Sequence, residues 1–355
     1  MKVAEVKKNL GCRSRLPTLV LRLKKTVFYK TMISAKNQKD CPVKTDKKIV
    51  LSADLGGTNL RMAAVDCNGK ILHRTKLRTP KTNESASIVQ VIVESAIECR
   101  QKSHGEVFAI AAAVPGTVDI KKGVIVTAPN LSALNGLQIS KVLEKKLNLP
   151  CLLENDANAA AIGENWLGAS KSFQDSIFVT LGTGIGGGII INGKVLRGID
   201  GTAGEIGHLC VEPNGAECGC GSRGCVEQYS SATAVVRLAR ELSKQFPKSN
   251  LNIDPTVTSL EIYGAAKAGD KLALEVFRQQ GFYLGIALAG LINILNPEII
   301  VVGGGAAAAW DLFMPHTVEQ IHKRAYQVPA KRAKIVRARL GDDAGILGAA
   351  RLAFD

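Results

Sequence analysis

A strand, a glycine turn and a second strand follow one another at two places in this chain, and this repeated unit constrains the fold more than any other feature. The first copy begins with the apolar run at 49–54 and ends before the hairpin signal Asn68-Gly69. The second copy begins with the run at 176–181 and ends before another hairpin signal, Asn192-Gly193. A unit that is used twice predicts a protein built from two related halves.

The segments outside the two copies alternate between strand and helix patterns. Further strands are expected at 71–76, 107–114, 150–153 and 297–302. Helices are expected at 84–103, 137–147, 157–167, 229–245, 257–295 and 343–354. This alternation is typical of an α/β protein, and a length of 355 residues predicts two domains.

No segment has the pattern of a membrane span or a signal peptide. The longest apolar region, 281–305, is interrupted by polar residues and Pro297, which predicts a buried helix that leads into a buried strand. The stretch 16–23 is too short and too charged for the core of a signal peptide. We therefore expect a cytoplasmic protein with no membrane partner, whose nine cysteines form no disulfides.

The positive charge of the chain is concentrated near its start. The net charge is +15, and residues 1–48 contain 14 basic and 3 acidic residues, which leaves a net charge of only +4 for the rest. A basic segment of this kind could bind nucleic acid or acidic lipid. A solvated, partly disordered extension is the simpler interpretation, and we expect no nucleic-acid partner.

The first glycine turn could bind phosphate. Gly56 and Gly57 present backbone N–H groups without an obstructing Cβ atom, and the hydroxyl of Thr58 adds a further donor. Asp54, at the end of the strand, could hold Mg²⁺ through water, and Arg61 brings a positive charge nearby. The competing interpretation is an ordinary β-hairpin with no ligand.

The second glycine turn, 182–187, matches the pattern G-x-G-x-x-G, but a dinucleotide-binding fold requires a helix directly after it. Residues 189–191 have a strand pattern instead, which excludes that fold. The sequence also lacks the G-x-x-x-x-G-K-[ST] motif of P-loop enzymes. Two glycine hairpins that face each other from two domains could instead hold the phosphates of ATP.

The polar segment 154–158 follows a buried strand and opens a helix, a place where the ligand clefts of α/β proteins form. Asp156 could accept the proton of an attacking hydroxyl, which is the role that aspartate plays in phosphoryl transfer. The competing interpretation is a helix N-cap, for which Asn155 and Asp156 both qualify.

Four potential metal ligands lie close together in the sequence: His208, Cys218, Cys220 and Cys225. A set rich in thiolates favours a tetrahedral, structural zinc site. A redox role would favour C-x-x-C, and a nucleic-acid zinc knuckle would have basic and aromatic neighbours, so both alternatives are weaker. Glu205 and Glu227 flank this loop and could present carboxylates to sugar hydroxyls.

Five segments of the chain resemble, in the same order, those of the ROK family, which contains bacterial sugar kinases and sugar-responsive repressors. They are Asp54-Leu-Gly-Gly-Thr-Asn59, Glu154-Asn-Asp-Ala-Asn158, Leu181-Gly-Thr-Gly-Ile-Gly-Gly-Gly188, Gly204-Glu-Ile-Gly-His208 and Cys218-Gly-Cys-Gly-Ser-Arg-Gly-Cys-Val-Glu227. The resemblance implies a two-lobed, actin-like (ribonuclease H-like) ATPase fold with a structural zinc loop. It does not cover the basic extension at 1–48, which is expected to be disordered, and it implies a small α/β domain at 49–158 plus 341–355 and a large α/β domain with the zinc loop at 159–340.

The resemblance also implies a role for each site residue. Asp156 would be the catalytic base, and the sugar would be held by Asn130, Asn155, Asp156, Glu205, His208 and Glu227. Mg²⁺ and ATP would be held by Asp54, Gly56, Gly57, Thr58, Asn59, Arg61, Thr183 and Gly184, with the nucleoside near Gly303 and Gly304. Zn²⁺ would be held by His208, Cys218, Cys220 and Cys225, and would order the sugar site rather than take part in the chemistry.

The function that the resemblance implies is ATP-dependent phosphorylation of a hexose at its primary hydroxyl, with glucose the first choice of substrate. Fructose, mannose and N-acetylhexosamines are the alternatives. A sugar-responsive repressor is a weaker alternative, because residues 1–48 show neither the paired amphipathic helices nor the turn of a helix-turn-helix domain. A zinc-stabilised scaffold without activity is weaker still. Similar proteins suggest a homodimer or homotetramer.

Overall fold

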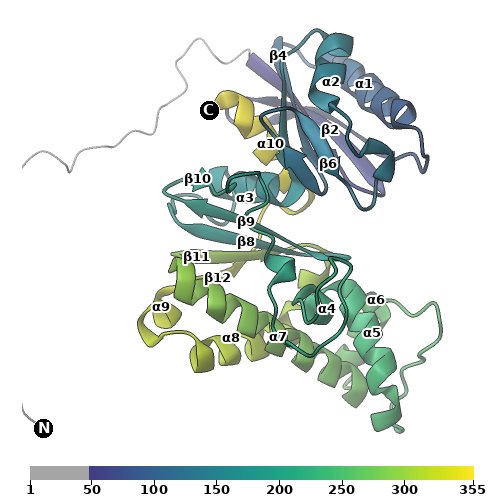
Figure 1. Ribbon diagram of the computed structural model, residues 1–355, viewed down its shortest axis with the longest axis vertical. Helices are drawn as coiled ribbons and strands as arrows, with labels where there is room; N and C mark the ends of the chain where they lie inside the picture. Colours follow the sequence, from purple (N-terminus) through teal and green to yellow (C-terminus); the bar gives the residue numbers. More distant parts are fainter. Residues whose placement is uncertain (1–47) are drawn as a thin grey trace, which may run out of the picture. The chain divides into compact units, whose positions relative to one another are not determined.

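Two five-stranded sheets with equivalent strand orders form the framework of the protein, as shown in Figure 1. The structure is a computed structural model that describes residues 48–355, so the predictions for the basic extension lie outside the described residues apart from Lys48. The first sheet has the order β3-β2-β1-β4-β7 and the second the order β10-β9-β8-β11-β12. In each sheet the first three strands are antiparallel and the last two add in parallel. The prediction of two related halves is confirmed.

The strands of both sheets are short, and those in the middle of each sheet are largely buried, whereas β3, β10 and β12 contain no buried residue. Those of the first sheet are β1 (Lys48–Leu55), β2 (Asn59–Asp66), β3 (Ile71–Arg78), β4 (Glu106–Val114) and β7 (Cys151–Asn155). Those of the second are β8 (Ser176–Leu181), β9 (Ile185–Ile191), β10 (Lys194–Val195), β11 (Ile299–Gly303) and β12 (Lys334–Arg337). A separate hairpin is formed by β5 (Thr117–Asp119) and β6 (Val124–Thr127). The strand predictions are confirmed except that β5, β6, β10 and β12 were not expected.

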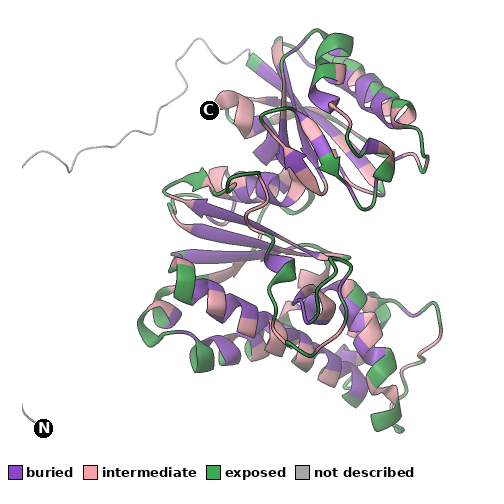
Figure 2. Ribbon diagram, in the orientation of Figure 1, coloured by how far each residue is buried: buried purple, intermediate pink, exposed green. Residues whose placement is uncertain are grey.

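The first sheet is covered by helices on both faces. Ile49 and Leu51 of β1 face the core shared with α1 (Ser85–Lys102) and α2 (Ile139–Leu147). Val50, which points to the opposite face, packs in the core that contains α10 (Ala344–Phe354). Both faces of β1 are therefore apolar, which is why it reads as a continuous hydrophobic run. The central strands β1 and β4 are largely buried (Figure 2), whereas β3 at the edge of the sheet contains no buried residue.

The second sheet is covered on one face by most of the remaining helices. These are α4 (Glu227–Ser230), α5 (Ala232–Leu242), α6 (Ser259–Lys267), α7 (Lys271–Leu295), α8 (Trp310–Arg324) and α9 (Gln327–Arg332). The two long helices that were predicted are each divided in two. Ser231 caps α5 and Asp270 caps α7, and the left-handed conformation of Gly269 ends the helical path before Asp270. Within residues 48–355, no helix has the length and apolar character required to cross a bilayer.

The helix α3 (Asp156–Trp166) packs on the other face of the second sheet, directly on β9. The predicted turn at 182–187 was too long, because β9 begins at Ile185 and its glycines lie in the strand. A Cβ atom at Gly188 would lie 2.5 Å from the Cβ of Ala161. A Cβ atom at Gly186 would lie 2.9 Å from that of Ala157. These glycines therefore allow the first turn of α3 to lie against the second glycine hairpin.

The helices α3 and α10 also pack tightly on each other. A Cβ atom at Gly348 of α10 would lie only 1.6 Å from the carbonyl oxygen of Ala159. The fully buried carboxylate of Glu164 accepts hydrogen bonds from the backbone N–H groups of Arg339 and Leu340, which precede α10. Backbone contact and a buried acceptor thus hold the two helices together.

Replacing Gly348 by alanine is expected to lower the free energy of unfolding by about 3 kcal/mol, because the new methyl group overlaps backbone that has no room to move. Gly290→Ala in α7 is the matched control, since a Cβ atom there meets nothing within 4 Å. That change should be neutral or stabilise the helix slightly. Urea unfolding of both variants measures the difference, and equal midpoints would contradict the packing described here.

Candidate active site

Asp156 is the first residue of α3, and the residue before it caps the helix. The side-chain oxygen of Asn155 accepts from the N–H groups of Ala157 at 2.9 Å and Asn158 at 3.1 Å. Its Nδ2 donates to the carbonyl of Gly116 at 3.0 Å. Of the two candidates for the cap, Asn155 takes the role, and the carboxylate of Asp156 remains available for chemistry.

The environment of Asp156 raises its pKa to about 6. Burial is the largest cause, and the nearby negative charges of Asp54 and Glu205 act in the same direction, while the N–H of Ala157 opposes them. Asp54 and Glu205 thus act electrostatically on Asp156, and the roles predicted for the three carboxylates stay predictions. A carboxyl group with this pKa is suited to accept a proton near neutral pH.

The first glycine hairpin lies beside another predicted sugar ligand. The turn is closed by the N–H of Gly56, which donates to the carbonyl of Asn59 at 2.9 Å. A Cβ atom at Gly57 would lie 3.0 Å from the Cβ of Asn130. The predicted phosphate turn and a predicted sugar residue are therefore neighbours.

Arg61, which was predicted to help hold ATP, forms ion pairs with two carboxylates. Its guanidinium pairs with Asp54 at 3.1 Å and with Asp342 at 2.8 Å, so it connects β2 with the segment before α10. Burial raises the pKa of Asp54, and the charge of Arg61 only partly offsets this effect. In this arrangement Arg61 faces the carboxylate that was predicted to hold Mg²⁺, and its role toward phosphate stays a prediction.

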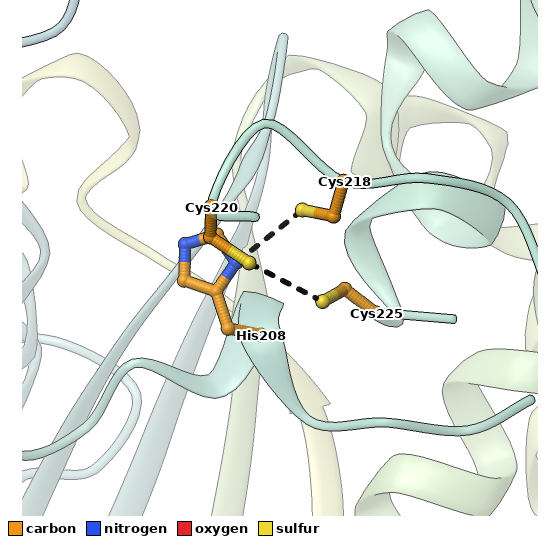
Figure 3. Close-up of side chains that lie close together, drawn as sticks. All are labelled: His208, Cys218, Cys220 and Cys225. Atoms are coloured by element: carbon orange, nitrogen blue, oxygen red, sulfur yellow. Dashed lines mark hydrogen bonds between the residues drawn. The ribbon is translucent and has the colours of Figure 1, made fainter. Parts of the chain in front are cut away.

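The four predicted metal ligands form one cluster, which Figure 3 shows in detail. Their donor atoms all lie within 4.8 Å of one another. The Sγ of Cys218 is 3.6 Å from the Nδ1 of His208, and the Sγ atoms of Cys220 and Cys225 are 3.7 Å apart. Around tetrahedral zinc with ordinary bond lengths, S···S and S···N edges measure about 3.8 and about 3.6 Å. The donor chemistry of the cluster and these two distances are compatible with zinc.

His208 connects the metal cluster with the active site. Its Nδ1 faces the thiols, while its Nε2 lies 4.0 Å from the carboxylate of Glu205. Since a metal on Nδ1 would leave the proton on Nε2, the ring would present a donor on the side of Glu205. The two predicted roles of His208, toward metal and toward sugar, would therefore use opposite sides of one ring.

Sequence comparison gives the wider context of this site. Residues 50–355 match the ROK family. The chain belongs to the ROK family. A glucokinase of Halalkalibacterium halodurans is 38% identical over 308 residues, which are 84% of this chain and 92% of that protein.

Solved structures of the ROK family include both enzymes and regulators. A ROK family glucokinase from Streptomyces griseus, in complex with glucose and AMPPNP, is 35% identical with a TM-score of 0.73, covering 86% of this chain and 98% of that one. A ROK family transcriptional regulator, a homologue of the E. coli MLC protein, is 29% identical with a TM-score of 0.80, covering 87% of this chain and 79% of that one.

This ROK protein has a pocket of about 240 Å³ beside the second hairpin that the sequence did not reveal. Its walls include Gly182 and Thr183 and the apolar side chains of Val235, Leu260, Tyr263 and Phe277. Gly305 lines it, whereas the predicted Gly303 and Gly304 do not; a Cβ atom at Gly304 would lie 2.4 Å from the carbonyl oxygen of Leu181. The apolar residues lie far from the glycine motifs in the sequence, and no motif marks them.

A larger cavity, of about 880 Å³, lies between the loop at 245–257 and the turn between α6 and α7. None of its lining residues is a predicted site residue. Asp254 accepts from Thr256, and Asp270 accepts from Ser249 and Asn250, so these carboxylates are used in local turns. This cavity does not have the chemistry of the predicted active site.

Sequence reasoning also missed Arg197. Glu154 is 0% exposed, and its carboxylate pairs with Nη2 of Arg197 at 2.7 Å and accepts from Nε at 2.8 Å. The carbonyl of Arg197 accepts from the N–H of Ala203, which closes the loop that leads to Glu205. The pair therefore attaches the loop that leads to Glu205 to β7, the strand that ends directly before Asp156. The available signal in the sequence was Glu154 itself, which lies near the end of an apolar strand, because a buried glutamate needs a cationic partner.

Protonation of Asp156 should switch the enzyme off. We expect kcat/KM for the sugar to fall about tenfold per pH unit below about 6, because the raised pKa makes Asp156 a base only above that value. Glu205→Gln removes one of the charges that raise this pKa, so its acid limb should move to lower pH. Steady-state pH profiles of kcat/KM for the sugar, measured at saturating Mg-ATP for the wild type and for Glu205→Gln, test both statements. Identical acid limbs in the two proteins would contradict the assignment to Asp156.

Proposed function

We propose that this protein is an ATP-dependent sugar kinase that transfers the γ-phosphoryl group of ATP to the primary hydroxyl of a hexose, most simply glucose. The observation that carries the proposal is the position of Asp156. It lies at the first turn of the helix that packs on the second glycine hairpin, close to Asp54 and Glu205, with a pKa raised to about 6. The named activity of the glucokinase relatives supports it.

In the proposed reaction Asp156 accepts the proton of the primary hydroxyl while the hydroxyl oxygen attacks the γ-phosphorus. The new O–P bond forms as the bond to the β,γ-bridging oxygen breaks, and ADP leaves with that electron pair. Backbone N–H groups of the two glycine turns would hold the phosphates. Mg²⁺, when bound, neutralises phosphate charge, and Asp54 is the residue that would hold it.

The proposed sugar site combines carboxylates, amides and one imidazole. A sugar is a ring of hydroxyls, and a site with several fixed polar partners rejects sugars that leave those partners unpaired. Asn130, Glu205, His208 and Glu227 would supply such partners in addition to the segment at 155–156. Glucose is the first choice because of the relatives, and fructose, mannose and N-acetylhexosamines remain the alternatives.

We propose that the cluster of His208, Cys218, Cys220 and Cys225 holds a structural zinc ion, which would fix the loop between two sugar-binding residues. Because a thiolate site of this kind requires reduced cysteines, we place the reaction in the cytoplasm.

We propose the domain division that the sequence indicated, with a small domain at 49–158 plus 341–355 and a large domain at 159–340. The separate sheets support it, as does the packing of α10 on the first sheet. A homodimer or homotetramer remains a prediction, which light scattering would test.

A sugar-responsive regulator is the second candidate, favoured by the TM-score of 0.80 to the transcriptional regulator. A coupled assay of ADP release with Mg-ATP and a panel of hexoses and N-acetylhexosamines separates the two candidates. Turnover with one preferred sugar is expected. Folded, zinc-replete protein that turns over no sugar, but binds one, would favour the regulator.

A further inference from the structure

The second glycine turn is held by the segment that follows the metal cluster. The N–H of Ile185 donates to Oε2 of Glu227 at 2.8 Å, and the N–H of Ala232 donates to the carbonyl of Gly182 at 2.9 Å. The hydroxyl of Thr233 donates to the carbonyl of Thr183 at 2.8 Å. Three hydrogen bonds thus attach the turn at 182–185 to the segment at 227–233.

Glu227 lies so close to the turn that its position depends on a glycine. A Cβ atom at Gly184 would lie 2.2 Å from Oε2 of Glu227. Glu227 begins α4, two residues after the metal ligand Cys225, so its main chain is fixed from both sides. Within residues 48–355 its second oxygen, Oε1, has no protein hydrogen-bond partner, which leaves it for a sugar hydroxyl.

We propose that Glu227 is a positioning residue for the nucleotide as well as a sugar ligand: through Oε2 it fixes the turn that receives the phosphates, and so couples sugar binding to ATP binding. The inference rests on the proposed kinase function. Without this acceptor the turn loses a charge-assisted hydrogen bond and becomes less ordered. ATP must then order the turn when it binds, which lowers the affinity of the protein for ATP. The coupling is reciprocal, so sugar and nucleotide strengthen each other's binding by the same factor.

The test measures binding of Mg-AMPPNP by calorimetry, without sugar and with saturating sugar, to the full-length, zinc-replete protein. Glu227→Ala is expected to weaken nucleotide binding about tenfold even when no sugar is present, since it removes a hydrogen bond to a charged group. Glu227→Gln keeps an acceptor oxygen for the N–H of Ile185 and should remain within about threefold of the wild-type value.

Thr233 provides a variant that does not alter the predicted sugar residues. Thr233→Val removes the hydroxyl that binds the carbonyl of Thr183, and should weaken Mg-AMPPNP binding about fivefold while leaving sugar affinity unchanged. Thr233→Ser restores the hydroxyl and should restore the affinity. This pair carries the test if Glu227→Ala fails to fold.

Wild-type affinity for Mg-AMPPNP in both Glu227→Ala and Thr233→Val would overturn the inference and leave the proposed function intact. Folded wild-type protein that binds sugar but no Mg-AMPPNP would overturn both the inference about Glu227 and the proposed kinase function. The two failures can therefore be told apart. Weakened nucleotide binding only when sugar is present would also overturn the inference, because Glu227 would then act through the sugar alone.

Discussion

Asp156→Ala is expected to lower kcat for sugar phosphorylation by about 10³-fold while changing KM for the sugar much less. A positioned general base contributes about 10² to 10⁴ in rate, and Asp156 begins the helix that packs on the second glycine hairpin. Asp54 and Glu205 are near enough to raise the pKa of Asp156, but both were assigned to ligands instead. Steady-state kinetics over the sugar that the panel identifies gives both constants.

Asp156→Asn is the control for this prediction, because it keeps the shape of the side chain and an oxygen that accepts from the N–H of Ala157. It should be as inactive as the alanine variant. Burial raises the pKa of Asp156 in the folded protein, so the charged form destabilises the fold above pH 6. The asparagine variant should therefore melt at a higher temperature at pH 7.5. Activity within tenfold of wild type in either variant would rule out Asp156 as the base.

Loss of the proposed zinc ion should have the second largest effect. Cys225→Ser removes a fully buried ligand, and we expect KM for the sugar to rise about 100-fold and the melting temperature to fall. The physical reason is that the cluster fixes His208 next to Glu205 and fixes Cys225 two residues before Glu227. Sugar titrations, calorimetric melts and measurement of bound zinc test the three parts of this statement.

Cys210→Ser is the matched control, since Cys210 is an exposed thiol near the cluster but is not one of the four grouped ligands. It should retain zinc, stability and KM. A zinc-free Cys225→Ser protein with unchanged KM would show that the loop is ordered without metal. If Cys210→Ser and Cys225→Ser lost stability and sugar binding equally, the effect would not be specific to the four grouped cysteine and histidine ligands.

The parts of the fold that depend on local pattern were predictable from the sequence. The strands of both glycine hairpins have continuous apolar runs and ended close to where they were expected. The segment at 305–337 was not predicted, because α8 contains Pro315 in its interior and β12 is only four residues long and partly exposed. A helix with an internal proline and a short edge strand give weak local signals.

In the candidate site, too, the features that depend on local sequence were predictable and those that depend on distant residues were not. The metal ligands are close in the sequence, so their spacing was enough to find three of the four and to suggest His208. The pairing of Glu154 with Arg197 and of Arg61 with Asp342 joins residues that are distant along the chain. Only tertiary structure brings such partners together, and a charged residue in a sequence does not identify its partner.

The four glycines that fix α3 have a consequence for how such an enzyme can evolve. Gly163, Gly186, Gly188 and Gly348 belong to no predicted ligand set, yet a Cβ atom at any of them would collide with α3, β9 or α10 or their neighbours. The location of Asp156, the proposed catalytic base, therefore depends on positions at which even alanine is too large. In a random mutagenesis screen for activity, these positions should be as intolerant as Asp156 itself, while substrate preference remains free to drift at the residues that touch the sugar.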